Sequence, residues 1–406
     1  MKYWISYLIA AIFAAITVAL TRFAEAHTVL MDMVYPYMSR VVMNALAEWS
    51  AGGGCLWQKW LTTAIICGSI FLVLICVFKW NLIQWCGWVL AAISLGVMLN
   101  TGIYELNAYA SPMADDMRLE ISSYTVAELN EATVYFRDRA NKLAAEISRD
   151  GNGNPNFGTF EEMTIQAENG FKTMTYEKSV SVFAGSTVPV KKQEWFLEEG
   201  VSGMLLPLTG EASVNPNVPT VSMPFAISKI MAQRMCIYSD SDSDFAAFLA
   251  CANNESKAFK YSAYLMAYYY CYETLAAMDS PNAQACATET NKGVSPELMR
   301  DLEACRSFYS KTPEESKKVL AEIPEKYREE LENASGGENL ALEAYTFSQY
   351  SNVTDLLASW YIQEFIVPKH REEEIPFDPF DPGQVDLSGI VNAPTEPPET
   401  TAPAAS

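Results

Sequence analysis

Three long apolar runs within the first hundred residues place the strongest constraint on how this chain folds. They cover about residues 4–20, 60–78 and 82–99, and none of them contains a charged side chain. A helix needs about 20 mainly apolar residues to cross the hydrocarbon core of a bilayer. The runs therefore predict three transmembrane helices in a membrane domain, residues 1–101, whose partner is the lipid bilayer.

The first run also has features of a secretory signal peptide. It is short for a membrane span, and Ala24-Glu25-Ala26 offers a small-residue cleavage site behind it. Because two further apolar runs follow, we favour an uncleaved first span and keep cleavage as the alternative.

The positions of two lysines predict on which side of the membrane the rest of the chain lies. Lys2 precedes the first run, and Lys79 lies in the short turn between the second and third runs. Lysine and arginine are enriched in cytoplasmic loops, so both ends are expected in the cytoplasm. The polar remainder is then extracytoplasmic, in a multi-pass protein of the cell membrane.

Residues 102–371 have the pattern of a folded and mainly α-helical domain. Thr125 and Glu128 form a capping box ahead of an apolar periodicity that predicts a long helix ending near Arg149. Short β-branched runs within residues 157–218, such as residues 179–190, indicate minor β structure and suggest a small hairpin or an irregular lid.

Two further segments have a different character. Residues 34–49 form an amphipathic pattern entered through Pro36, which predicts a helix at the membrane surface or between the spans. Residues 372–406 are acidic and then rich in proline and threonine. With little apolar surface to offset the entropy of ordering, they are expected to be a disordered tail.

The charge balance excludes one class of partner. The chain has 28 lysine and arginine residues against 49 acidic residues, and its formal net charge is −21. A surface that binds nucleic acid has to be basic in order to hold phosphates. We therefore expect no nucleic-acid partner.

Five cysteines follow the apolar runs in sequence. Their spacing contains no CxxC and therefore gives no zinc-ribbon or redox motif. Buried free thiols are the favoured interpretation, and a disulfide between Cys286 and Cys305 is the alternative. The five residues are Cys236, Cys251, Cys271, Cys286 and Cys305.

One polar stretch has the ligand spacing of an EF-hand calcium loop. Pro155 stands where that loop requires glycine, however, and the sequence DGNGNPN is typical of a polar turn between elements. We favour the turn. The matching side chains are Asp150, Asn152, Asn154, Asn156 and Glu161.

A second acidic stretch, residues 239–244, reads SDSDSD and precedes an apolar helix. Serine and aspartate are preferred N-cap residues, because their side chains accept hydrogen bonds from the first amides of a helix. Capping is therefore favoured over metal binding here.

The features that bear most on function lie within residues 207–271. Their order resembles a bacterial membrane-protein family known as domain of unknown function 3810 (DUF3810). In that family a TGEANVN-like segment leads to PFTxxHExxHxxGF, then to EDEANFxAxLAC and a YSxYLxA helix. The matching residues are Thr209-Gly210-Glu211-Ala212, Pro224-Phe225, Phe245, Ala247, Leu249-Ala250-Cys251 and Tyr261-Ser262-Ala263-Tyr264-Leu265.

The resemblance implies the scaffold of a zinc metallopeptidase whose catalytic side chains have been replaced. In HExxH, two histidines bind zinc and the glutamate acts as general base. Aligned without a gap, Lys229 falls at the first histidine, Ile230 at the glutamate and Gln233 at the second histidine. An ammonium repels a dication, isoleucine cannot accept a proton and an amide is a poor zinc ligand. We expect no catalytic residue, no bound zinc and no other cofactor.

The resemblance also indicates which acidic residues belong to the former cleft. The acidic ligand of the family corresponds to Asp242, or to Asp240 if the register slips by two residues. Glu211 belongs to residues 209–214, which either border the cleft or form a structural loop. Both histidines of the chain, His27 and His370, are far from these residues in sequence.

These features predict three N-terminal transmembrane helices followed by an α-helical, zincin-like extracytoplasmic domain with minor β structure. The expected function is that of an inactive, membrane-anchored metallopeptidase-like protein, which binds or regulates a polypeptide or another component of the cell envelope. Two alternatives stay open: a hydrolase whose metal is held by Asp240, Asp242 and Asp244, or a purely structural membrane protein.

A last expectation concerns Lys229. Carboxylates arranged around a lost dication repel one another, and burying one without a partner is costly. The Lys229 ammonium is expected to replace the charge of zinc by pairing with Asp242 or Asp240. The alternative is that Lys229 points into solvent.

Overall fold

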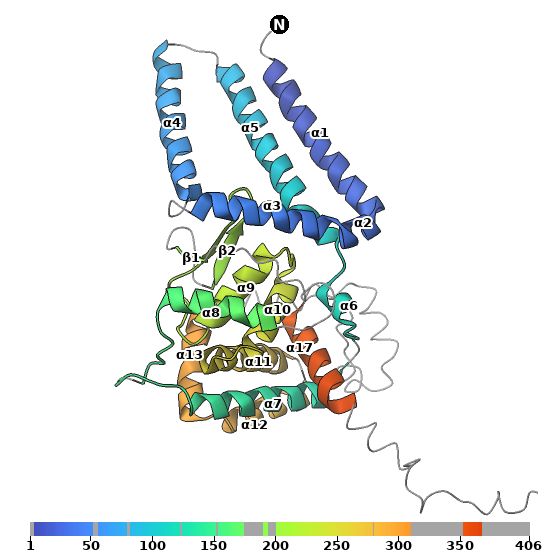
Figure 1. The fold of residues 1–406 in the computed structure, drawn as a ribbon, viewed down its shortest axis with the longest axis vertical. Helices are drawn as coiled ribbons and strands as arrows, with labels where there is room; N and C mark the ends of the chain where they lie inside the picture. The colour runs from blue at the N-terminus through green and yellow to red at the C-terminus, as the bar shows by residue number, and fades with distance from the viewer. Residues whose placement is uncertain are drawn as a thin grey trace, which may run out of the picture. The chain divides into compact units, whose positions relative to one another are not determined.

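The computed structural model in Figure 1 describes most of the chain as helices. It divides the chain into two units, Met1–Trp360 and Tyr361–Ser406. The described residues are 4–51, 56–78, 82–121, 124–151, 153–173, 190–193, 200–278, 280–309 and 352–367. The predicted tail, residues 372–406, lies outside them, as does most of the β-branched run at residues 179–190.

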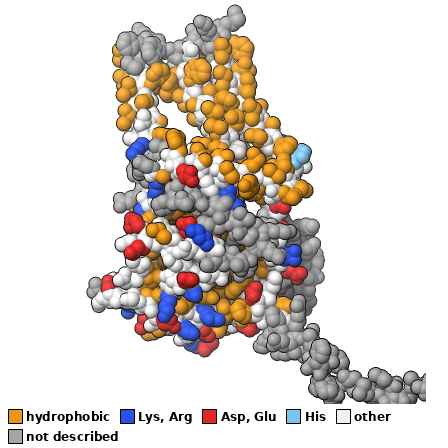
Figure 2. Space-filling model, viewed as in Figure 1, with side chains coloured by type: hydrophobic (Ala, Val, Ile, Leu, Met, Phe, Trp, Pro, Cys, Tyr) orange, Lys and Arg blue, Asp and Glu red, His pale blue; other side chains and the backbone are white. Residues whose placement is uncertain are grey.

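All three predicted spans are helices: α1 (Trp4–Ala26), α4 (Leu56–Phe78) and α5 (Leu82–Ile103). Each is long and apolar enough to cross a membrane, and Figure 2 shows hydrophobic side chains covering this part of the molecule. α1 packs along α5. It is longer than predicted because the helix continues past the apolar run, where Arg22 and Glu25 form an ion pair of 2.8 Å.

The predicted amphipathic helix follows α2 (Thr28–Met33) and is α3 (Tyr35–Ser50), with a proline in its first turn. It crosses the ends of the spans and separates them from the body (Figure 1). One face is buried and the opposite face is exposed and largely apolar. The buried residues are Ser39, Met43, Ala47 and Ser50, and the exposed ones include Met38, Val41, Val42 and Trp49.

The body is built of packed helices around α11. They are α7 (Val126–Ala144), α8 (Phe160–Thr173), α9 (Met223–Arg234), α10 (Asp240–Ala252), α11 (Lys257–Ala277), α12 (Pro281–Lys292), α13 (Pro296–Tyr309) and α17 (Val353–Tyr361). The short helices η2 (Glu105–Tyr109) and α6 (Met113–Met117) connect α5 to the body, and η3 (Ile362–Ile366) follows α17.

The capping box that the sequence predicts is present at the start of α7. The Thr125 side chain accepts from the Glu128 amide, and the Glu128 carboxylate accepts from the Thr125 amide at 2.7 Å. α7 ends earlier than predicted, because the chain then turns. Arg149 lies beyond the end of α7, and its guanidinium forms an ion pair of 2.6 Å with the buried carboxylate of Asp301 on α13.

A hairpin is present within residues 157–218, whereas most of the run at residues 179–190 that suggested it lies outside the described residues. β2 (Gly203–Leu206) and β3 (Glu211–Val214) pair antiparallel, with Leu206 opposite Glu211, and β1 (Lys191–Lys192) pairs parallel on the other side of β3. The turn between β2 and β3 docks on α3. Gly210 has φ 65° there, and a Cβ would lie 2.5 Å from the Ala47 nitrogen, so only glycine fits.

Aromatic side chains fill the core between α7, α10 and α11. Phe136, Phe245, Phe248, Tyr261 and Tyr268 are fully buried. Phe136 and Phe248 meet edge to face, with ring centroids 5.7 Å apart. Three of the six tyrosines of α11, Tyr261, Tyr268 and Tyr269, are therefore core residues.

The polar stretch with calcium-loop spacing forms a turn. The Asp150 carboxylate accepts hydrogen bonds from the amide and the side chain of Asn154, and Gly153 has φ 83°. Asn152 lies outside the described residues. The carboxylate that would bind calcium is thus used to close the turn.

Cys286 and Cys305 are both free thiols, so the alternative disulfide is absent. Cys236, Cys251, Cys271 and Cys305 are buried. These four residues match the favoured interpretation of the cysteines as buried free thiols, whereas Cys286 is only partly buried.

Candidate functional site

The helix that the resemblance aligns with HExxH is α9, and ten of its residues are buried. It contacts α8, α10, α11, β2 and β3. Pro224 occupies its first turn, where a missing amide proton costs nothing. The free amide of Phe225 donates to Ser262 Oγ of α11 at 3.2 Å. The start of α9 is therefore fixed by the YSAYL segment.

Lys229 is the centre of a charged network between α9 and α10. Its Nζ lies 3.0 Å from Asp244 Oδ2 and 3.3 Å from Asp240 Oδ1. The Lys229 and Asp244 side chains are only 16% and 10% exposed, whereas Asp240 is 81% exposed. Gln233, one turn later on α9, donates from Nε2 to Asp240 Oδ1 at 3.1 Å. The ammonium thus bridges a buried and an exposed carboxylate.

Lys229 keeps its positive charge in this network. Burial lowers the pKa of the ammonium, but Asp244 and Asp240 more than compensate, so the pKa of Lys229 is above its usual value. Burial raises the pKa of Asp244, and the Lys229 ammonium offsets part of that rise. The Asp244 carboxylate therefore depends on Lys229 for its charge.

Ile230, which the resemblance aligns with the glutamate of HExxH, is part of the core. It is 1% exposed. Its side chain packs so closely on β2 that a Cβ at Gly203 would lie 2.6 Å from Ile230 Cγ1.

Asp242 does not share in the Lys229 network. Its amide donates to the Ser239 hydroxyl at 3.0 Å, which makes Ser239 the N-cap of α10. This confirms the capping role predicted for the acidic stretch and explains why α10 begins at Asp240. Asp242 instead lines a cavity together with Asp32 and Arg40.

Glu211 belongs to a different ion pair. Its side chain is fully buried on β3, and Oε1 lies 2.9 Å from Lys191 Nζ. Lys191 also donates to the carbonyl of Ser50 at the end of α3. Glu211 is therefore connected to α3 through Lys191, and the structure does not bring it into the Lys229 network.

Hydrogen bonds from α3 and from the residue after α5 fix the end of α9. Cys236 has φ 70°, a left-handed conformation in which glycine is preferred. The Arg40 Nε donates to the Met235 carbonyl at 3.0 Å, and the Tyr104 hydroxyl donates to the Gln233 carbonyl at 3.2 Å. Helix α3 and the end of α5 thereby hold the loop that leads to Asp240.

Two residues of this site were missed by sequence reasoning. The sequence assigns Asp244 to capping or to metal binding and not to Lys229, although its spacing of four from Asp240 places both carboxylates on one face of a helix. Arg40 gave no signal, because its contact with Met235 joins residues that are distant in sequence.

The fold and the site together define a membrane protein with three apolar helices and an attached helical body. The model of the family described as "Protein of unknown function (DUF3810)" matches residues 31–338. This range is most of the chain, so the chain belongs to that family. Comparisons with curated proteins and with solved structures found no match.

Proposed function

We propose that this protein is a membrane-anchored relative of zinc metallopeptidases that keeps their scaffold without their chemistry, and that its body binds or regulates a partner at the cell envelope. The partner class is a polypeptide or another envelope component. The body is extracytoplasmic, on the side opposite Lys2 and Lys79.

One observation carries the proposal: the Lys229 ammonium lies within 3.0 Å and 3.3 Å of two carboxylates of α10. In a zincin, a dication joins the motif helix to an acidic residue of a following helix. Here a lysine of the motif helix makes that connection as a single positive charge. The side chains present therefore do not suit zinc.

The register of the comparison has independent support. Counting along PFTxxHExxHxxGF from Pro224 places the glycine of the pattern at Cys236. Cys236 has φ 70°, a conformation that glycine adopts without strain. The backbone at this point is thus the one a glycine-containing pattern requires, which favours Lys229 and Gln233 as the positions of the two histidines.

The alternative of a hydrolase with carboxylate ligands has less support. Of Asp240, Asp242 and Asp244, the first and third contact Lys229. Among the described residues, no group of three or more His, Cys, Asp and Glu side chains is arranged to hold a metal.

A histidine-restoration experiment tests the proposal. The full chain is purified in detergent, incubated with zinc and desalted, and its metal content is measured. We expect no stoichiometric zinc in the natural protein and no peptide hydrolysis. In the variant with Lys229→His and Gln233→His, we expect about one zinc ion per chain, because two histidines then face the acidic residues of α10.

The matched control is the double variant with Asp138→His and Lys142→His, which puts the same histidine pair on the exposed face of α7. It should retain less zinc, since α7 offers no third ligand from a facing helix. Stoichiometric zinc in the natural protein would contradict the loss of metal. Equal zinc retention by the two folded variants would contradict the zincin scaffold.

A further inference from the structure

Helices α2 and α3 carry most of the large apolar side chains that are exposed outside the spans. Nine such residues between Val29 and Trp49 are exposed, whereas the described residues from 104 to 309 have only three, Ile165, Val201 and Tyr238. An apolar surface of this kind marks contact with a membrane or with another protein. The nine residues are Val29, Leu30, Met33, Val34, Tyr37, Met38, Val41, Val42 and Trp49.

In α3 these side chains lie on one face of the helix. Val41, Val42 and Trp49 follow Met38 by three, four and eleven residues, which is the spacing of one helical face. The opposite face packs on the body, through α9 and β3. The helix therefore lies between the body and whatever covers its apolar face.

Both ends of α3 are fixed beside the ends of spans. The Tyr35 hydroxyl donates to the Gly102 carbonyl at the end of α5, at 3.0 Å. The ring centroids of Trp49 and of Trp60, in the second turn of α4, are 5.5 Å apart. α5 has 22 residues, about 33 Å of helix, which matches a hydrocarbon core of about 30 Å. The axis of α3 thus runs along the level where the spans leave this core (Figure 1).

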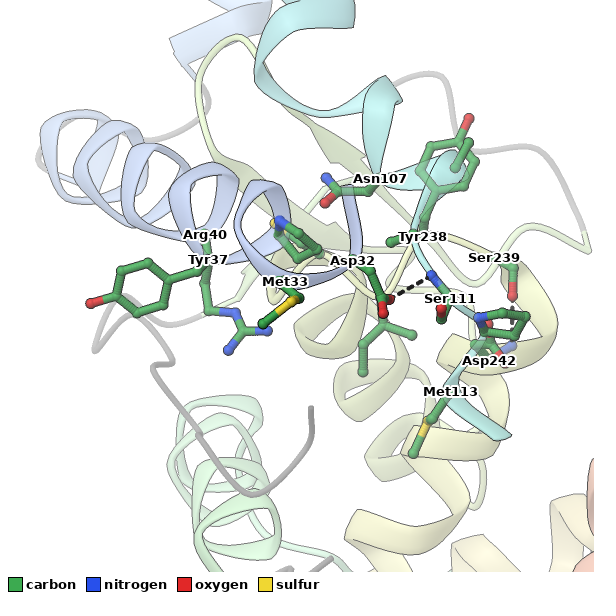
Figure 3. Close-up of a pocket in the computed structure, with 16 residues that line it drawn as sticks. Asp32, Met33, Tyr37, Arg40, Asn107, Ser111, Met113, Tyr238, Ser239 and Asp242 are labelled. Carbon is green, nitrogen blue, oxygen red and sulfur yellow. Dashed lines mark hydrogen bonds between the residues drawn. The ribbon is translucent and has the colours of Figure 1, made fainter. Parts of the chain in front are cut away.

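Aromatic side chains are exposed at the same level. Tyr37 is 62% exposed and points away from the other labelled side chains in Figure 3. Trp49 and Trp60 are 60% and 46% exposed. Tyrosine and tryptophan are enriched where acyl chains meet headgroups, because their apolar rings carry one polar group. The three rings match that boundary.

The charges of α2 and α3 indicate how a membrane would be bound. Residues 28–50 contain one basic residue, Arg40, and two acidic residues, Asp32 and Glu48. Helices held by anionic lipids carry many lysines and arginines. Apolar contact has to supply the attraction here, and the apolar face continues the surface of the spans.

We propose that α2 and α3 lie in the lipid leaflet next to the body, with their apolar face against the acyl chains at headgroup depth, and so hold the body on the membrane surface. The loop between α9 and α10, which Arg40 holds through the Met235 carbonyl, then lies beside the headgroups. The inference does not depend on the relation to metallopeptidases.

Photo-crosslinking from the full chain in lipid nanodiscs tests the proposal. Val41→p-benzoylphenylalanine puts the crosslinker on the apolar face of α3, and Ile93→p-benzoylphenylalanine puts it on α5 as the reference for acyl-chain contact. The control is Ile165→p-benzoylphenylalanine, on α8 of the body. The three replaced side chains are 53%, 59% and 64% exposed. Mass spectrometry and gel electrophoresis then detect phospholipid adducts and crosslinked dimers.

We expect the Val41 variant to form lipid adducts in a yield near that of the Ile93 variant, and the Ile165 variant to form few or none. The yield at residue 41 should be the same in phosphatidylcholine alone and with added phosphatidylglycerol, because apolar contact does not require anionic lipid. A crosslinked dimer in place of the lipid adduct at residue 41 would assign this face to a second copy and overturn the proposal. Equal lipid yields at residues 41 and 165, or a yield at residue 41 that requires phosphatidylglycerol, would also overturn it.

Discussion

Among single residues, buried carboxyl groups are the ones whose behaviour depends most on the fold. Asp355 in the first turn of α17 is 1% exposed, and its Oδ1 accepts from the Tyr124 hydroxyl at 2.6 Å. Burial raises the pKa of Asp355 to about 7, from its usual value of 3.8. The folded protein therefore holds a proton on Asp355 at a pH where the unfolded chain has lost it.

This difference predicts a pH dependence of stability. The protonated carboxyl contributes its full stability below about pH 4, and the contribution is lost as pH rises through 7, by up to about 4 kcal/mol at 1.4 kcal/mol per pKa unit. Asp355→Asn keeps the acceptor for Tyr124 without a titrating group. We expect Tm of the natural protein to fall more than that of Asp355→Asn between pH 5 and pH 8.

The control for this prediction is Glu303→Gln, an exposed carboxylate of α13, which should leave the pH dependence unchanged. The same fall in Tm in Asp355→Asn as in the natural protein would show that Asp355 is not the titrating group.

At the scale of elements, the contact between α9 and α10 depends on one ion pair with little exposure. Lys229→Ala leaves Asp244 buried without its cation, so we expect a loss of about 3 to 5 kcal/mol in the free energy of unfolding. The double variant with Lys229→Met and Asp244→Leu removes both charges and should lose clearly less. Denaturant unfolding followed by circular dichroism measures both.

Asp240→Asn is the matched control for this pair, because Asp240 is 81% exposed. Asp240→Asn should lower the free energy of unfolding by less than about 1 kcal/mol, as is usual for exposed ion pairs. A loss below 1 kcal/mol for Lys229→Ala as well would mean that the ammonium contributes nothing to the contact between the helices.

At the scale of the whole molecule, the proposal that the body is extracytoplasmic is open to a labelling experiment. Gly151 is exposed and a Cβ there has no atom within 4 Å, so Gly151→Cys places a thiol on the surface of the body without distortion. We expect a membrane-impermeant maleimide to label this variant in intact cells more strongly than it labels the natural protein.

The control for cytoplasmic labelling is the variant Lys79→Cys, in the turn that the sequence places in the cytoplasm. It should react only after the cells are permeabilised. If instead Gly151→Cys requires permeabilisation, the topology is inverted, and the positive-inside argument from Lys2 and Lys79 is wrong for this chain.

Local signals in the sequence determined much of the fold. The three spans, the amphipathic helix ending near Trp49, the capping box at Thr125 and the N-cap at Ser239 were all predicted. Each of them depends on residues within a few positions of one another, so the interaction that forms the element is already visible in the order of residues. The family followed from the same kind of information, since its segments match in order.

Only the tertiary structure decided which groups meet at the site. The sequence offered Asp242 or Asp240 as partners of Lys229, and the structure supplies Asp240 and Asp244. The choice depends on the rotation of α10 about its axis, which is set by the packing of its buried face and not by the spacing of its aspartates. Glu211 was assigned to the cleft for its place in a motif, yet it pairs with Lys191 because β1 and β3 are neighbours in the sheet. Such pairings join residues whose distance in space the chain order does not fix.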